Sequence, residues 1–218
     1  MPKTNLKTQA YQTIRHRIVT CEYAPGAFIN EELLTTELHL SRTPIRDALS
    51  RLEQEGLVRI MPKRGIIVTP LSVTDINLIF EIRFLYEPYI LRTYGSLLSE
   101  QKLMEFYNIF LHKDSDHEFF KNSDYFYSLD SEFHSMIVNA CPNFYLCDNY
   151  HRIQTQDQRF RYMSGSFSTH RMEETCLEHL DILACCLQKN WADAAEKMVF
   201  HLEESKKATF QLIFDKMK

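Results

Sequence analysis

Apolar residues recur every three or four positions along most of the chain, and this spacing predicts helices. Over residues 6–20 the apolar positions share one helical face, so we expect the first element to be an amphipathic helix. A turn at Ala24–Gly26 follows it, and a short helix over Glu31–Leu38 then begins with Asn30 as its N-cap. The chain therefore opens with two helices that are separated by a turn.

The stretch SRTPIRDALSRLEQEGLV, residues 41–58, predicts a third helix with a marked start and end. We expect Thr43 to be the N-cap and Pro44 to take the first helical position, where its missing N–H costs nothing. Gly56 is suited to the C-terminal cap. The face that we expect to point inward consists of Ile45, Ala48, Leu49 and Leu52.

Two short β-branched runs follow this helix, at Leu57–Ile60 and Ile66–Thr69, and the residues between them are basic. Such runs predict a two-stranded hairpin. Three helices followed by a two-stranded hairpin make a winged helix-turn-helix, in which the hairpin is the wing. We therefore expect residues 1–70 to form a DNA-binding domain of this class.

Beyond Pro70 the helical spacing continues to the end of the chain without an internal repeat. We expect residues 71–218 to form an all-α antiparallel bundle, which makes the whole chain mainly α. The expected helices are Thr74–Leu97 with a bend at Pro88, Glu100–Lys113, Ser123–Ala140, Phe144–Met163, Thr169–Lys189 and Trp191–Met217.

Composition adds a charge asymmetry and excludes two classes of protein. The formal net charge is -4, yet residues 1–70 carry 10 Lys+Arg against 7 Asp+Glu, so the acidic excess lies in the second part. No segment approaches 18 consecutive apolar residues, so we expect no membrane span and a cytoplasmic location. The six cysteines contain no C-x-x-C pair, and we expect reduced thiols rather than a disulfide framework or a zinc knuckle.

Arginines at the start of the third helix oppose the helix dipole, whose positive end lies there. A polyanion outside the chain would remove this conflict, and the N-terminal residues of a recognition helix contact bases and phosphates. For any single arginine, a solvated surface residue is the simpler explanation. The candidate DNA contacts are Arg42, Thr43, Arg46 and Ser50 on the helix and Lys63, Arg64 and Gly65 on the wing.

The helical body contains a candidate metal site. Asp130 and His134 lie one helical turn apart, a spacing that also occurs by chance. His179 and His201 are equally distant from Asn190, where we expect the last two helices to turn, so both histidines can meet at one level of an antiparallel pair. One Asp and three His suit Zn, Ni or Mn and leave positions open for water or a ligand.

Arg83 and Glu87 share the inward face of the first body helix, four residues apart. An internal Arg-Glu ion pair is one interpretation. The other is that the Arg83 guanidinium binds the carboxylate of a small-molecule effector. The opposite face carries an apolar stripe, which consists of Leu78, Leu85 and Tyr89. We expect this stripe to pack against another helix or another subunit.

The first 70 residues resemble a known family. SRTPIRDALSRLEQEGLV and the wing KRGIIV are similar to the signature of GntR-family bacterial transcription regulators, over about residues 8–70. The resemblance implies that Arg42, Thr43, Arg46 and Gly65 contact DNA. Glu31 and Glu32 depart from the pattern, because some members have a basic residue in that helix.

The body resembles the helical effector domain of the FadR-like (FCD) branch of the same family. The similar segments are IRFLYEP, DSEFH, EHLDIL and the late His201-Leu202. The resemblance implies a divalent metal, with Zn favoured, and a small organic acid that is bound between the metal and an arginine. The matching residues are Asp130, His134, His179 and His201 for the metal and Arg83 for the acid, with Arg159 and Arg161 as further candidates.

These observations predict a homodimeric DNA-binding transcription regulator, which a carboxylate effector controls and which is not an enzyme. The resemblance to the family implies a repressor rather than an activator. Two alternatives use the same residues. A metal-dependent hydrolase would use the Asp130 cluster as its catalytic centre. A DNA-binding adaptor would bind another protein through its body and no small molecule.

Overall fold

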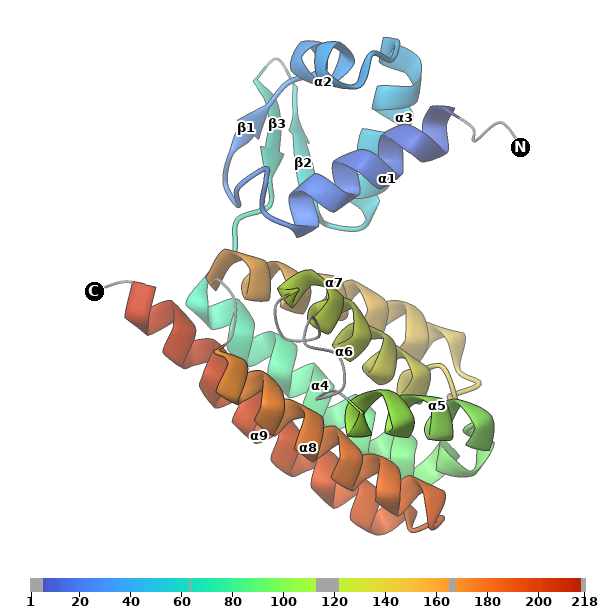
Figure 1. The fold of residues 1–218 in the computed structure, drawn as a ribbon. Helices are drawn as coiled ribbons and strands as arrows, with labels where there is room; N and C mark the ends of the chain where they lie inside the picture. The colour runs from blue at the N-terminus through green and yellow to red at the C-terminus, as the bar shows by residue number, and fades with distance from the viewer. Residues whose placement is uncertain (1–5, 63, 113–121, 165–167, 217–218) are drawn as a thin grey trace. The chain divides into compact units, whose positions relative to one another are not determined.

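The computed structural model describes residues 6–62, 64–112, 122–164 and 168–216. The chain divides into two compact units, Met1–Ser72 and Val73–Lys218, called here the N-terminal unit and the helical unit (Figure 1). Among the helices that the structure describes, none combines the length and hydrophobicity that a membrane span requires. The fold is mainly α, as the sequence predicts, with a winged helix-turn-helix followed by a helical bundle.

The N-terminal unit contains three helices and a small antiparallel sheet. In chain order its elements are α1 (Leu6–Val19), β1 (Phe28–Ile29), α2 (Glu31–Leu38), α3 (Arg42–Gln54), β2 (Val58–Met61) and β3 (Gly65–Val68). The strand order is β1-β3-β2, so β3 lies in the centre. A third strand thus joins the expected two-stranded wing: Ile29 of β1 pairs with Ile66 of β3. Two residues are too few to show a hydrophobic period in the sequence.

The core of the N-terminal unit forms where α3 packs against α1. The predicted inward face of α3 is fully buried there, with Ile45, Leu49 and Leu52 beside Ile14 and Ile18 of α1. This packing leaves the opposite side of α3 exposed. The sequence therefore fixes which side chains of α3 are free to meet a partner.

The start of α3 differs from the prediction, and its end agrees. The N-cap is Ser41 rather than Thr43, so Pro44 is the third helical residue. Proline is tolerated there because the first four N–H groups of a helix have no partner within it. At the other end Gly56 adopts a φ of +75°, and the N–H groups of Gly56 and Leu57 donate to Glu53 and Leu52. These bonds form a Schellman cap, which requires the left-handed conformation that glycine adopts freely.

The helical unit is a bundle of six helices, among the residues that the structure describes, with one short 3₁₀ turn. Its elements are α4 (Val73–Tyr94), η1 (Gly95–Leu97), α5 (Glu100–Leu111), α6 (Ser123–Val138), α7 (Phe144–Ser164), α8 (Thr169–Leu187) and α9 (Trp191–Lys216). The predicted helices begin and end within three residues of these bounds, and α4 continues through Pro88. Lys113 and Met217, the expected ends of two helices, lie outside the described residues.

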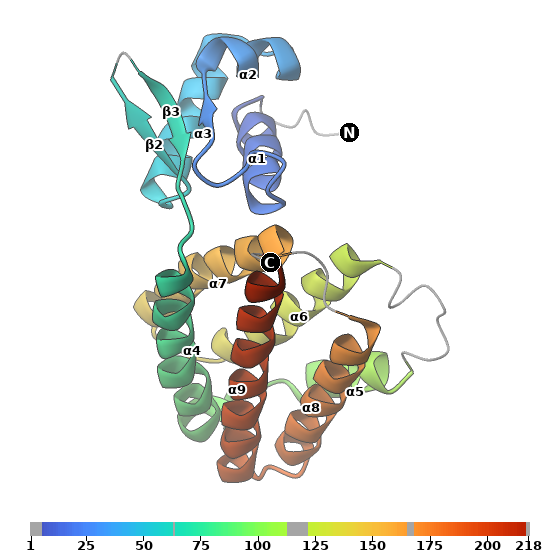
Figure 2. The ribbon, with the colours of Figure 1, turned by 90° about the vertical axis from the view of Figure 1, so that its left-hand side faces the viewer.

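Three helices of this unit lie side by side, with α9 between α4 and α8 (Figure 2). The chain reverses between α8 and α9 at Asn190, whose N–H and that of Lys189 donate to Cys185 and Cys186. Helix α6 packs against α4 and α7. Inward-facing residues of α4, α6, α8 and α9 can therefore meet in the interior of this unit.

Candidate metal centre and nucleic-acid interface

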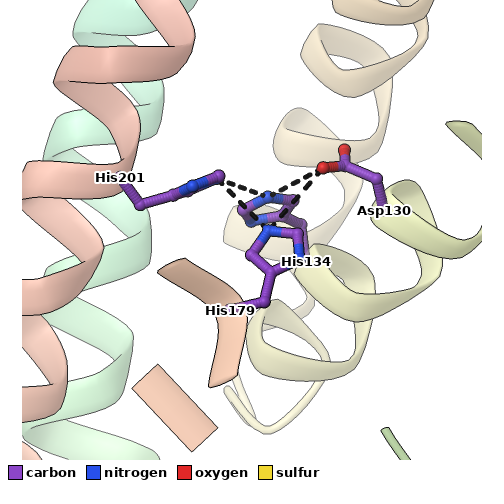
Figure 3. Close-up of side chains that lie close together, drawn as sticks. All are labelled: Asp130, His134, His179 and His201. Carbon is purple, nitrogen blue, oxygen red and sulfur yellow. Dashed lines mark hydrogen bonds and ion pairs between the residues drawn. The ribbon is translucent and has the colours of Figure 1, made fainter. Parts of the chain in front are cut away.

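The structure brings the four predicted metal ligands together in the interior of the helical unit (Figure 3). Asp130 and His134 come from successive turns of α6, His179 from α8 and His201 from α9. The side chains of all four are buried, and one ligand atom of each lies within 4.8 Å of the others. The reversal at Asn190 sets His179 and His201 at one level, as equal distance from the turn predicts.

The spacing of the four ligand atoms matches that around a single ion. Asp130 Oδ1 lies 3.8 Å from His134 Nε2 and 3.7 Å from His179 Nε2. His201 Nε2 lies 3.4 Å from His179 Nε2 and 3.2 Å from His134 Nε2. Ligands about 2.0–2.1 Å from a tetrahedral Zn²⁺ are separated by about 3.4 Å. These residues therefore fit a divalent cation at their centre.

Two glutamates orient two of the imidazoles. Glu87 Oε2 lies 2.6 Å from Nδ1 of His134, and Glu178 Oε2 lies 2.6 Å from Nδ1 of His201. In a neutral imidazole whose Nδ1–H donates to a glutamate, Nε2 carries a lone pair. Two such lone pairs would face each other across 3.2 Å between His134 and His201, a repulsion that a cation removes. Carboxylates on the far nitrogen of metal-binding histidines are a common arrangement.

The third histidine has no such support. Nδ1 of His179 is buried and makes no hydrogen bond with any residue that the structure describes. The ring lies instead against Phe133 and Phe110, with centroids 4.2 Å and 4.9 Å away. Packing rather than hydrogen bonding therefore fixes the orientation of His179.

A chain of buried ion pairs extends from Asp130 to Glu87. Asp130 pairs with Arg161, whose Nη2 lies 2.9 Å from Asp157 Oδ2. The same oxygen lies 3.1 Å from Arg83 Nη1, and Arg83 Nε donates to Glu87 Oε1 over 2.7 Å. These contacts join α4, α6 and α7 around the cluster, and each buried charge has an opposite partner, as burial requires.

The electrostatic surroundings place Asp130, His179 and His201 in forms that bind metal. Burial opposes ionisation of Asp130, but Arg161 and His134 lower the pKa of its carboxyl below the usual range. Loss of hydration, together with a neighbouring imidazole, lowers the pKa of His179 and of His201 well below the usual value. At neutral pH Asp130 is therefore a carboxylate and the imidazoles of His179 and His201 are neutral, so metal binding displaces no proton from these three groups.

Arg83 forms the internal ion pair that was one of the two interpretations of its spacing. Its side chain is 2% exposed and contacts both Glu87 and Asp157. Tyr150 also donates to Glu87 Oε1, over 2.7 Å. Arg83 thereby holds Glu87, and Glu87 holds His134. Of the two further candidates for the acid, Arg161 pairs with Asp130, and Arg159 is buried and donates to Gln156.

In the N-terminal unit the candidate DNA contacts of α3 lie on its exposed side. Arg42, Thr43 and Ser50 are exposed, and Arg46 Nε lies 2.9 Å from both carboxylate oxygens of Glu31 at the start of α2. This pair is not predictable from the sequence, because the register between two short helices depends on how they pack. The arrangement leaves polar side chains, two of them arginines, exposed near the start of α3.

On the wing the structure describes two of the three candidate contacts. Arg64 is exposed, and Lys63 lies outside the described residues. Gly65 has a φ of +99°, and a Cβ at this position would lie 3.1 Å from the backbone oxygen of Ile29. The close approach of β1 therefore explains this glycine within the fold itself.

Sequence reasoning missed Glu178, although a signal for it was present. Residues 178 and 201 are also almost equally distant from the turn at Asn190, as 179 and 201 are. The same argument that pairs His179 with His201 thus places Glu178 beside His201. Glu178 in turn binds Arg171 through two contacts, of 2.6 Å and 3.0 Å.

The fold and the two sites define a winged-helix DNA-binding protein whose helical unit encloses a cluster of Asp and His. Residues 6–68 match the family described as bacterial regulatory proteins, gntR family, and residues 78–204 match the FCD domain. The chain belongs to this GntR family of transcription regulators, in the group with an FCD domain, so regulation of transcription through DNA binding is its class of function.

Similar proteins span nearly the whole chain. The HTH-type transcriptional repressor RspR of Escherichia coli K12 is 30% identical over 212 residues, which cover 97% of this chain and 92% of that protein. The solved structure of Escherichia coli McbR/YncC has a TM-score of 0.78 at 16% identity, over 95% of this chain and 98% of that one. A GntR regulator from Rhodococcus sp. RHA1 has a TM-score of 0.77 at 17% identity, over 95% and 99%. At these identities the two structures support the fold alone.

Proposed function

We propose that this protein is a repressor whose operator binding is controlled by a small organic acid at a divalent metal in the helical unit. The metal ligands are Asp130, His134, His179 and His201, and Zn²⁺ is the ion that the donor set favours. Repression is supported by the description of the Escherichia coli relative as a repressor. A cytoplasmic location follows from this role, because the operator of a bacterium lies there.

The convergence of one carboxylate oxygen and three Nε2 atoms carries this proposal. Burying so many polar groups costs free energy unless they are paired or bind a metal. A protein-binding adaptor would have no use for such a cluster in its core. A hydrolase would need a free base beside a metal-bound water. The two glutamates that contact the histidines, Glu87 and Glu178, are hydrogen-bonded to them and are not free to act as a base. This favours a sensor over a hydrolase.

The charge of the centre favours an anionic effector. Three carboxylates (Asp130, Glu87 and Asp157) and two guanidinium groups (Arg83 and Arg161) form the fully buried network of ion pairs beside the cluster, so this set carries one net negative charge. A divalent ion would change this to one net positive charge. A carboxylate would then neutralise a buried cation, which is a strong drive for binding.

Arg83 is the proposed partner of the effector's carboxylate. To bind the acid, it would exchange its contact with Asp157, the longer of its two ion pairs, for the ligand. Arg83 lies on α4, and α4 begins five residues after β3 ends. A change at Arg83 therefore acts on the helix that follows the wing in the chain, which is the proposed route from effector to DNA affinity.

DNA recognition is assigned to the exposed side of α3 and to the wing. Arg42, Thr43, Arg46 and Ser50 would contact base edges and phosphates in the major groove. Lys63, Arg64 and Gly65 would lie near the adjacent backbone. The exposure of the α3 residues supports this assignment.

A homodimer would place two recognition helices on two half-sites. Its surface is proposed to be the outer face of α4, where Leu78, Leu85 and Tyr89 are 54%, 61% and 47% exposed. Glu81 and Arg92 are exposed on the same face. If two copies of α4 pack antiparallel around residue 87, Leu85 faces Tyr89 of the other copy, and Glu81 lies within one residue of the level of Arg92 of the other copy. The face is therefore complementary to itself, as a two-fold interface requires.

Leu85→Glu tests this surface, because it buries a charge in the proposed interface. We expect sedimentation to show a dimer for the wild type and a monomer for the variant. Leu177→Glu on α8 replaces an equally exposed leucine, 58% against 61%, and should remain a dimer. A dimeric Leu85→Glu variant would place the interface elsewhere.

Metal analysis of the purified protein tests the centre. We expect about one divalent ion per chain in the wild type, and its loss in the variant with His179→Ala and His201→Ala, because two of four ligands are gone. His170→Ala is the matched control, since His170 lies on α8 with a side chain that is 80% exposed. Unchanged metal content in the double variant would contradict the proposed site.

A further inference from the structure

Glu31 occupies a position next to the proposed DNA-reading surface where a negative charge is unexpected. It is the first residue of α2, behind the N-cap Asn30, whose side chain accepts a hydrogen bond from Leu33 over 2.7 Å. The positive end of the α2 dipole stabilises a carboxylate there. Phosphates are bound at such helix ends in other proteins, and Glu31 opposes that use of α2. The helix dipole thus explains why a carboxylate is stable at this position, but it does not explain why one lies beside a proposed DNA contact.

The contact with Arg46 supplies this explanation. Nε of Arg46 lies 2.9 Å from both carboxylate oxygens of Glu31, so the carboxylate holds the guanidinium through the Nε–H group alone. Neither Nη group of Arg46 makes a hydrogen bond within the part of the chain that the structure describes. Bidentate recognition of guanine O6 and N7 needs two N–H donors. The contact thus leaves the two terminal nitrogens of Arg46 free for a base edge.

The contact with Glu31 also changes how strongly Arg46 binds bases compared with phosphates. An arginine binds any phosphate through its charge, and this attraction is independent of sequence. The carboxylate of Glu31 offsets that charge but removes none of the Nη donors. Complementary charges serve specificity more than affinity, and a repulsive group that acts against wrong partners is a common device.

We propose that Glu31 is a specificity-determining residue, which orients Arg46 toward a base and weakens its attraction to phosphates. This inference rests on the proposed DNA contact of Arg46. Glu31 itself is a positioning residue, because it acts through Arg46. In this arrangement the acidic start of α2 serves recognition by α3, in place of the basic residue that some regulators have there.

The experiment compares two glutamates that are adjacent in the sequence. Glu31→Ala and Glu32→Ala change the net charge equally at the start of α2, but Glu32 makes no contact with Arg46 among the described residues. The probes are the duplex that the wild type enriches most from a random-sequence library and a shuffled duplex of equal length. Affinity for both is measured between 0.05 M and 0.3 M salt.

We expect Glu31→Ala to bind the shuffled duplex about fivefold more tightly at 0.15 M salt, because one more phosphate is neutralised. The ratio of affinities for the selected and the shuffled duplex should fall about tenfold. Glu32→Ala should change this ratio less than twofold. In an Arg46→Ala background, Glu31→Ala should no longer change it.

Equal effects of the two glutamate variants would overturn the inference, since charge alone would then explain them. So would an effect of Glu31→Ala that persists without Arg46. A wild type that selects no sequence at all would instead contradict the proposed DNA-binding role, so the two failures are distinguishable.

Discussion

Two arginine–glutamate pairs in this protein have the same chemistry and opposite surroundings. In the N-terminal unit the side chains of Arg46 and Glu31 are 64% and 33% exposed, whereas those of Arg83 and Glu87 in the helical unit are 2% and 0% exposed. Water can replace either partner of the first pair at small cost, but not of the second. The exposed pair leaves the terminal nitrogens of Arg46 available to a polyanion, and the buried pair holds His134 in place.

The difference in burial separates the roles of the two arginines. Exposed ion pairs contribute about 0–1 kcal/mol to stability, so Arg46 is not explained by the fold. Arg83 is part of a buried network, and within it an unpaired charge would be expensive. We therefore expect substitution of Arg83 to affect stability first, and substitution of Arg46 to affect DNA binding alone.

The largest effect is expected from Arg83→Ala. This change leaves Glu87 and Asp157 buried without their common cation, which should reduce the free energy of unfolding by about 3–5 kcal/mol. Trp191, the single tryptophan, begins α9 of the helical unit, so its fluorescence during urea unfolding reports on this unit. Arg152→Ala, an exposed arginine of α7, should change the value by less than about 0.5 kcal/mol. If the two variants are equally stable, the buried pair does not organise the centre.

A smaller effect, on DNA binding alone, is expected from Arg46→Ala. Loss of one phosphate or base contact should weaken operator binding by about 1–3 kcal/mol. The slope of log affinity against log salt concentration should become shallower by about 1. The unfolding transition, followed by circular dichroism, should move by no more than about 1 kcal/mol. If operator affinity changes neither with the substitution nor with the salt concentration, Arg46 does not contact DNA.

Local patterns in the sequence predicted the helices and the buried face of α3, because packing follows the helical period there. They misplaced the start of α3 by two residues, since Ser41 and Thr43 are equally good N-caps, and they missed the two-residue strand β1. Within the site, the spacing of Asp130 and His134 and the equal distances from Asn190 were sufficient to find each pair of ligands.

The contacts around the metal ligands could not be predicted from these local patterns. Arg83 and Asp157 are 74 residues apart, and Glu87 and His134 are 47 apart. Helical periods indicate which face of a helix is buried, but they do not indicate which helix covers it. The pairing of Glu31 with Arg46 was hidden for the same reason. In both units, therefore, only the tertiary structure shows which residues pair with the arginines.

In the proposed mechanism, the metal centre of the helical unit controls the DNA affinity of the N-terminal unit. An operator titration with a panel of organic acids, repeated after chelation of the metal, tests it most directly. We predict that one acid shifts the midpoint of DNA binding at least tenfold, as about 1.4 kcal/mol of coupling between the two sites would do. The shift should disappear after chelation and return when Zn²⁺ is restored. A midpoint that no acid moves, or a shift that persists without the metal, would contradict the account.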